Sequence, residues 1–217
     1  MKHNIINKLR NKNLSSITTV KAFLSDIPYQ SMKDYEQEVL NKLGIDAKIY
    51  ANRCNNFIFH EEGSRNLGIL HHDELVIIIY HPHKPIFAMG LFDLNASINR
   101  HVLELAKLVV EKGYSPDKLC VYFAPSIHFS NVVVDEKKKE DIIDKGFYRA
   151  IKPANNVNYV DIPLINVLAL EEIGFKFSNM DLSPYCTYEN SDLFYSQRRG
   201  DDKKLNLTLC YVKKSKK

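Results

Sequence analysis

Hydrophobic and polar positions change their spacing along the chain in a way that predicts both strands and helices. Residues 74–81 (ELVIIIYH) form a continuous run of apolar and β-branched side chains, which is typical of a strand buried on both faces. A turn with two prolines follows, and residues 86–91 are apolar again, so residues 74–91 are predicted to form a β-hairpin. Further apolar segments predict strands over 47–50, 57–60 and 119–123.

Apolar side chains at helical spacing predict a long helix over residues 95–113. They form one broad face, Asn95 or Ser97 is a candidate N-cap, and Gly113 is placed to end the helix. The order strand–helix–strand over residues 86–123 indicates a layered α/β domain. Other segments predict shorter helices over 31–43, 136–145 and 161–173.

Near the C-terminus, residues 205–211 alternate between apolar and polar side chains, which predicts a strand with one buried face. We therefore predict an α/β (α+β) fold with a single layered domain over residues 31–212. Residues 1–30 are polar and irregular in pattern and are predicted to be an N-terminal arm, for which loose packing is an expectation. Residues 213–217 form a basic tail.

Composition and charge exclude several classes of protein. Of the 217 residues, 45% are hydrophobic and 26% are charged, which excludes disorder as the main state. No run approaches the roughly 20 apolar residues that span a bilayer, and the N-terminus lacks the apolar core of a secretory signal. The net charge of +4 does not indicate nucleic-acid binding. Four cysteines without a C-x-x-C pair indicate reduced thiols. We expect a cytoplasmic protein with neither membrane nor nucleic-acid partners.

The C-terminal third carries the most specific motifs, and weaker ones precede it. They are HDE at 72–74, AMGL at 88–91, APSI at 124–127, DIPLIN at 161–166, CTY at 186–188 and FYSQRR at 194–199. In this order and spacing, the chain from about residue 71 to residue 212 resembles the bacterial laccase-domain family. The family is also called the peptidoglycan-editing-factor or polyphenol-oxidase family.

The resemblance implies an α/β/β/α layered domain with mixed sheets and a zinc- or copper-dependent site of two histidines and one cysteine. It also implies activity of the purine nucleoside phosphorylase or adenosine deaminase kind. In this sequence the family cysteine falls on Glu74 and one family histidine on Ala88. The other histidine is expected near residues 52–54, where Cys54 is the nearest metal-binding residue. The metal centre is therefore rewritten, and zinc, copper and no metal at all stay open.

Arg198 and Arg199 are the candidate substrate-binding residues, together with Ser196. A guanidinium group is a planar fork that bonds two oxygens of a phosphate or carboxylate at once and keeps its charge. The alternative is an arginine pair on the surface or at a sheet edge. Phosphate and a purine nucleoside are the small-molecule partners that the resemblance implies.

Glu74 and His72 are the candidate catalytic residues. A carboxylate at the start of an apolar strand is partly buried, which suits it to general acid–base work. Glu74 is also a candidate metal ligand with Cys54, and a solvated glutamate is the alternative. Five histidines lie close together in the sequence, and separate surface positions are the alternative to a shared metal site: His60, His71, His72, His81 and His83.

Three other residues have simpler interpretations. Asp161 and Asn166 are expected to serve the start of a helix and its packing. Cys186 is expected to be a small buried apolar group, with a nucleophilic role as the alternative. The paired histidine spacings of a multicopper oxidase centre are not present in this sequence.

Three hypotheses about function follow from the sequence. The first is a divergent laccase-domain enzyme acting on a purine nucleoside. The alternative is a pseudoenzyme that keeps the fold and binds a nucleotide or a protein partner. The third is a hydrolase that uses Cys54 or Cys186. The sequence does not indicate an oligomeric state.

Overall fold

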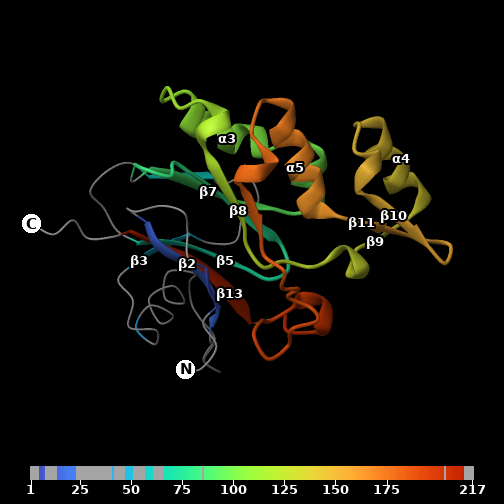
Figure 1. Ribbon diagram of the computed structural model, residues 1–217. Helices are drawn as coiled ribbons and strands as arrows, with labels where there is room; N and C mark the ends of the chain where they lie inside the picture. The colour runs from blue at the N-terminus through green and yellow to red at the C-terminus, as the bar shows by residue number, and fades with distance from the viewer. Residues whose placement is uncertain are drawn as a thin grey trace, which may run out of the picture.

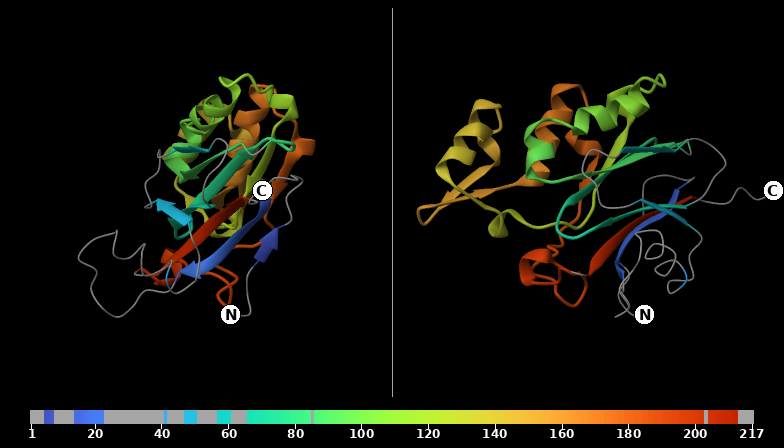
Figure 2. Two further views of the ribbon diagram at one scale, coloured as in Figure 1. Left: turned by 90° about the vertical axis from the view of Figure 1, so that its left-hand side faces the viewer. Right: turned by 180° about the vertical axis from the view of Figure 1, so that it is seen from behind.

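Two mixed β-sheets stack face to face, and helices cover the outer face of one of them (Figure 1). Figure 2 shows the same layers from two other directions. The computed structural model describes residues 5–7, 14–22, 41, 47–50, 57–60, 66–84, 86–202 and 204–212. The predicted α/β class with mixed sheets is confirmed. No helix among these residues has the length and apolar character needed to cross a membrane.

The central sheet has the strand order β12-β8-β6-β7-β4. Its strands are β4 (Phe57–His60), β6 (Leu75–Tyr80), β7 (Phe87–Phe92), β8 (Cys120–Phe123) and β12 (Met180–Leu182). β12 runs parallel to β8, and the other neighbours are antiparallel. β6 and β7 form the predicted hairpin, with Leu75 opposite Phe92 and Tyr80 opposite Phe87.

The second sheet has the order β1-β2-β13-β5-β3. Its strands are β1 (Ile5–Asn7), β2 (Leu14–Ala22), β3 (Ala47–Tyr50), β5 (Asn66–His71) and β13 (Leu205–Val212). The sequence analysis placed no strand in residues 1–30, and this was wrong: β2 pairs with the full length of β13. The predicted helix over 31–43 lies outside the described residues apart from Asn41, and the domain boundaries at residues 30 and 212 stay predictions.

Helices pack on the central sheet, and a small unit lies beside them (Figure 1). The helices on the sheet are α2 (Leu94–Ile98), α3 (Val102–Val110) and α5 (Ile162–Glu172). The small unit consists of α4 (Glu136–Asp144) with β9 (Val133–Val134), β10 (Ile151–Ala154) and β11 (Val157–Val160).

The single helix predicted over residues 95–113 is divided into α2 and α3. The break lies at Arg100, whose φ of 58° is left-handed, a conformation that costs energy for a residue with a Cβ. Contacts of the Arg100 side chain offset this cost: it pairs with Glu172 at 3.0 Å and lies 4.4 Å from the ring centre of Phe147. The N-cap of α2 is Asp93, because its carboxylate accepts a hydrogen bond from Ala96 N at 2.7 Å.

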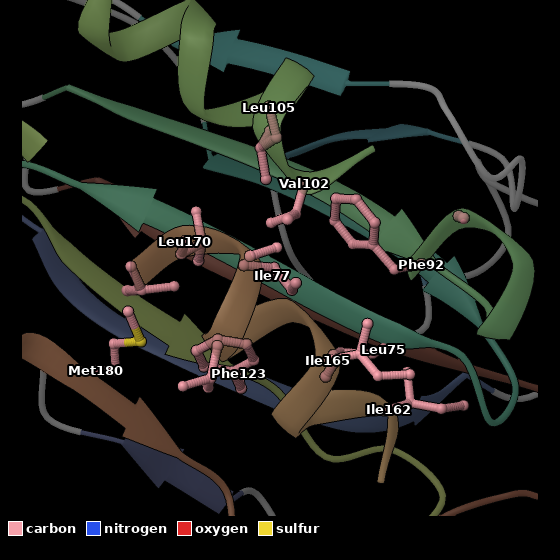
Figure 3. Close-up of a cluster of buried hydrophobic side chains, with 14 of the residues drawn as sticks. Leu75, Ile77, Phe92, Val102, Leu105, Phe123, Ile162, Ile165, Leu170 and Met180 are labelled. Carbon is pink, nitrogen blue, oxygen red and sulfur yellow. The ribbon is translucent and has the colours of Figure 1, made fainter. Parts of the chain in front are cut away.

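The strand β6 is buried on both faces, as its apolar run predicts. Leu75 and Ile77 lie in the core between the central sheet and the helices, and Figure 3 shows them with side chains from α3 and α5. Val76 and Ile78 point the other way, into the core between the two sheets. Alternate residues of one strand therefore fill both cores of the domain.

The prediction that β13 is half-buried was wrong, because both of its faces are covered. Cys210 lies in the core between the sheets, and Asn206 and Thr208, on the same face, are fully buried with it. Hydrogen bonds satisfy these polar groups. The Thr208 hydroxyl lies 2.8 Å from both the Thr19 hydroxyl and His71 Nε2.

Asp161 caps α5, as the sequence indicates, because its carboxylate accepts a hydrogen bond from Leu164 N at 3.0 Å. We predict that Asp161→Ala lowers the free energy of unfolding by about 1 kcal/mol, the usual effect of removing an N-cap acceptor. Urea unfolding followed by circular dichroism measures it. Asp161→Ser retains a capping oxygen and should recover most of the loss. Equal stability of Asp161→Ala and the unmodified chain would contradict the capping role.

Candidate functional site

The chain passes from one sheet to the other through residues 72–74, between β5 and β6. The backbone of His72 is held on both sides: its N–H donates to Glu74 Oε2 and its carbonyl accepts from Asn206 Nδ2, both at 2.8 Å. His72, Asp73 and Glu74 are all half-buried. The two predicted catalytic residues therefore share one short segment at the crossing between the sheets.

Asp73 connects this crossing to two later segments of the chain. Its carboxylate accepts hydrogen bonds from Thr187 Oγ1 at 2.6 Å, Ser196 Oγ at 3.0 Å and Arg198 N at 3.1 Å. We call these four residues the Asp73 clamp. The sequence analysis assigned Asp73 no role, although it stands in the middle of the HDE motif. The clamp brings the HDE, CTY and FYSQRR segments together.

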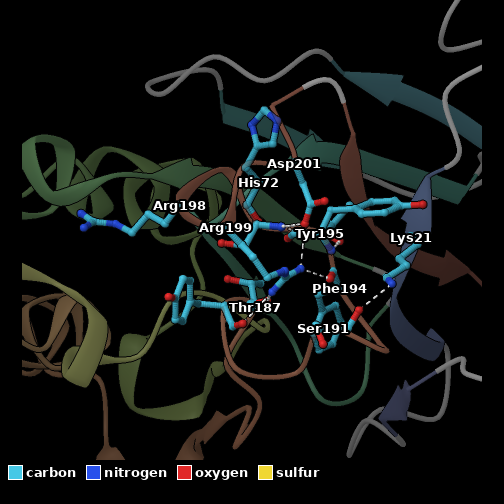
Figure 4. Close-up of polar contacts among 12 residues, drawn as sticks. Lys21, His72, Thr187, Ser191, Phe194, Tyr195, Arg198, Arg199 and Asp201 are labelled. Atoms are coloured by element: carbon cyan, nitrogen blue, oxygen red, sulfur yellow. Dashed lines mark hydrogen bonds and ion pairs between the residues drawn. The ribbon is translucent and has the colours of Figure 1, made fainter. Parts of the chain in front are cut away.

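Arg199 organises the loop that carries the last of these segments (Figure 4). Its Nη1 donates to the carbonyls of Thr187 and Tyr188 at 3.1 and 2.6 Å. Its Nη2 donates to Phe194 O at 2.7 Å and to Asp201 Oδ2 at 2.8 Å. Both terminal nitrogens of this guanidinium group are therefore engaged by acceptors of the protein itself.

Asp201 is the charged partner of Arg199 in this loop. Burial by itself raises the pKa of Asp201, but hydrogen bonds from Ser196 N and Arg199 outweigh it and hold the pKa below its ordinary value. Asp201 is therefore ionised at neutral pH and completes the set of acceptors around Arg199.

The other two predicted substrate-binding residues differ in exposure. Ser196 is fully buried, and its hydroxyl is bonded to Asp73. Arg198 is exposed, and Figure 4 shows its side chain pointing away from Arg199. Of the three, Arg198 is the residue whose side chain faces solvent.

His71 and His72 are adjacent and have different surroundings. His71 is fully buried, and burial lowers its pKa to about 4. His72 has both ring nitrogens shielded from solvent, and neither has a hydrogen-bond partner among the described residues. A shielded imidazole without a partner is costly, which makes His72 a candidate for contact with a ligand.

The described residues do not supply the metal site of two histidines and one cysteine that the resemblance implies. Glu74, where the resemblance implies a cysteine, has Oε2 bonded to His72 N. Ala88, where it implies a histidine, is a fully buried methyl group in the core beneath the helices. Cys54 lies outside the described residues. The predicted metal role of Cys54 and Glu74 stays a prediction.

The five histidines between residues 60 and 83 do not gather into a group with metal-binding geometry in the part of the chain that the structure describes. Instead, the ring of His60 packs on Phe87, with centroids 4.7 Å apart. His81 Nδ1 accepts a hydrogen bond from His83 N at 3.0 Å within a turn.

A different group has the geometry to hold a metal. Ligand atoms of His128, Cys186 and Glu189 all lie within 4.8 Å of one another. His128 follows the APSI motif, and Cys186 belongs to the CTY motif. The sequence analysis missed this group, because residues from two distant segments form it. The C-x-x-E spacing of Cys186 and Glu189 was the local signal available.

Solved structures share this arrangement of two sheets and a helical layer. A Neisseria meningitidis protein, NMB0706, matches with a TM-score of 0.79 and 12% identity, over 98% of this chain and all of that chain. The Bacillus licheniformis hypothetical protein YfiH matches at 0.70 with 13% identity, over 93% and 97% of the two chains. YlmD from Geobacillus stearothermophilus matches at 0.70 with 16% identity, over 94% of each chain. Identities this low establish the fold alone.

Sequence comparison establishes the family. A family model described as multi-copper polyphenol oxidoreductase laccase matches residues 66–206. The chain therefore belongs to this laccase-domain family, as its motifs indicated. A search of curated proteins finds no match.

The Asp73 clamp predicts a strong effect on stability. Asp73→Ala removes three hydrogen bonds and leaves the buried Ser196 hydroxyl without its acceptor. We expect the free energy of unfolding to fall by about 3 kcal/mol, measured by urea unfolding. Asp202→Ala is the control, because Asp202 is an exposed aspartate nearby. Similar small losses in both variants would show that the clamp does not hold the segments together.

The buried His71 predicts a dependence of stability on pH. Its pKa is about 4 in the folded chain and about 6.5 when unfolded, so the unfolded state binds more protons between these values. Stability should therefore be complete above about pH 6.5 and fall by up to about 3 kcal/mol as the pH approaches 4. Urea unfolding at several pH values measures this loss.

The variant His71→Gln carries no titrating group at this position and should lose less stability over the same range. A smaller dependence should remain, since burial also lowers the pKa of His60 and His81. Equal pH dependence in the variant and the unmodified chain would assign the effect to other groups.

Proposed function

We propose that this laccase-domain protein acts on a purine nucleoside and phosphate at the crossing between its two sheets. The observation that carries the proposal is His72, whose shielded imidazole has no hydrogen-bond partner among the described residues while its backbone is held on both sides. A positioned and unsatisfied polar group is suited to contact with a bound molecule. Family membership supports the nucleoside class.

The positive charge of Arg198 supports the proposal that the site binds phosphate. Arg198 N is bonded to Asp73 Oδ2, which is next to Glu74 and His72 in the chain. The Arg198 side chain is exposed, and a guanidinium group binds phosphate through two oxygens. Arg199 and Ser196 support the site indirectly, because their hydrogen bonds shape the loop that carries Arg198.

The chemistry of phosphorolysis assigns roles to these residues. A phosphate oxygen attacks the ribose carbon, the bond from that carbon to the purine nitrogen breaks, and the products are the free base and ribose phosphate. The phosphate gives up one proton and the leaving purine takes up one, so an acid–base group that passes a proton balances the reaction. We assign the proton transfer to Glu74. His72 forms a hydrogen bond to the purine base, and Arg198 positions the phosphate.

A pseudoenzyme that binds a nucleotide is the second candidate. Ala88 favours it, because a methyl group stands where the family has a histidine and the position is packed into the core. Binding would use the same His72 and Arg198 without turnover.

The full chain incubated with inosine, adenosine and phosphate tests both candidates, with chromatography to measure free base and ribose phosphate. We expect turnover that falls about 100-fold in Glu74→Gln and in His72→Ala. Arg198→Ala should raise the phosphate concentration needed for half-maximal rate. Arg149→Ala is the control, because Arg149 is exposed on a different part of the fold.

Turnover that persists in all three site variants would place the reaction elsewhere. No turnover by folded protein would reject the enzyme. In that case nucleotide binding measured by calorimetry, lost in His72→Ala and Arg198→Ala, would support the pseudoenzyme.

A further inference from the structure

His128, Cys186 and Glu189 form a compact group beside Ile127 and Thr187, two residues that hydrogen-bond to Asp73 in the crossing. His128 directly precedes the short 3-10 helix Phe129–Asn131, and the other two residues lie on the segment after β12. Their ligand atoms lie within 4.8 Å of one another. Cys186 is 1% exposed, His128 is half-buried and Glu189 is exposed, so the group extends from the interior to the surface.

The backbone around this group is fixed by hydrogen bonds. Ser126 and Cys186 form a parallel bridge between the two segments, and Thr187 N donates to Ser126 O at 3.0 Å. Cys186 N donates to Asn190 Oδ1, also at 3.0 Å. The two segments are therefore held side by side before any ion binds, which lowers the entropy cost of binding.

The ligand side chains have supporting partners of the kind that surrounds protein metal sites. Asn131 Nδ2 donates to Glu189 Oε1 at 2.7 Å, and Ser130 Oγ donates to the same oxygen at 2.9 Å. These bonds orient the carboxylate, and they hold the pKa of Glu189 below its ordinary value.

The sulfur atom also has donors around it. His128 N donates to Cys186 Sγ at 3.3 Å, and Asn131 Nδ2 lies 3.7 Å from the same sulfur. These donors hold the sulfur in place beside the other two side chains. The group therefore offers a sulfur, an imidazole nitrogen and a carboxylate oxygen together.

We propose that His128, Cys186 and Glu189 bind a zinc ion. Sulfur, nitrogen and oxygen together suit zinc, whereas calcium and magnesium take oxygen ligands. Zinc bonds of about 2.0–2.3 Å require the three side chains to move closer together by about 1 Å. Three protein ligands leave the fourth tetrahedral position for water.

The zinc site takes no part in the proposed nucleoside chemistry, but it lies next to the Asp73 clamp. It connects the segment after β8 to the CTY motif, where Thr187 donates to Asp73. Bound zinc therefore stabilises one arm of the Asp73 clamp.

Metal titration of the full chain tests the proposal. The protein is freed of metal with a chelator, and zinc is added in competition with a chromogenic zinc indicator. We expect one tight equivalent of zinc, an increase in melting temperature on binding, and at least about tenfold weaker affinity in His128→Ala and in Glu189→Gln. Cobalt in place of zinc should give a thiolate-to-cobalt absorption band that Cys186→Ser abolishes.

Two features keep the test free of folding artefacts. Cys186 is buried, so its variant must be checked by circular dichroism, but Glu189→Gln is at an exposed position and its amide oxygen still accepts from Asn131 and Ser130. Glu111→Gln, at an exposed glutamate after α3, is the matched control and should bind zinc as the unmodified chain does.

Unchanged zinc affinity in Glu189→Gln and His128→Ala would overturn the proposal, and so would the absence of zinc binding by the folded chain. Because the readouts are metal affinity, melting temperature and cobalt absorption, they do not depend on nucleoside turnover. Failure of the nucleoside assay therefore leaves this result intact, and the reverse also holds.

Discussion

The hydrogen bonds of Asp73 are the constraint on which the site depends. The chain crosses from one sheet to the other at residues 72–74, between β5 and β6, and the Asp73 carboxylate at that point accepts from Thr187, Ser196 and Arg198 N. These hydrogen bonds fix the last loop against the crossing, together with Asn206, which bonds to both His72 O and Tyr195. The Asp73 bonds therefore place the backbone of Arg198 beside the segment that carries His72 and Glu74.

The position of Asp73 depends in turn on the double burial of β6. A strand whose alternate residues fill two different cores cannot slip by one residue without exchanging both sets of side chains. Leu75 and Val76, the first residues of the strand, pack into opposite cores. The residues immediately before them are therefore fixed in register. Asp73 gains its orientation from packing, although it belongs to a turn.

Much of this fold follows from local pattern, and the site does not. The apolar run of β6 and the cap at Asp161 are visible in the sequence, because burial on both faces and helix capping leave signals within a few residues. The break at Arg100 depends on contacts with Glu172 and Phe147, which no local pattern shows. The clamp joins residues 114 to 125 positions apart. The alternation of apolar and polar residues in β13 predicted that its polar face is exposed. That face is buried because Thr208 bonds to Thr19 and His71, which are distant in the sequence.

The CTY motif places two consecutive side chains in two different groups of contacts. Cys186 and Thr187 are consecutive, and their side chains have different partners: the hydroxyl donates to Asp73, whereas the sulfur accepts from His128 N. The first contact is structural and belongs to the clamp. The second joins Cys186 to His128, although Cys186 also belongs to the core beneath the helices. Ala88, where the resemblance implies a histidine, is a buried methyl group in a packed core. The clamp and the two cores therefore hold the fold without a polar side chain at this position.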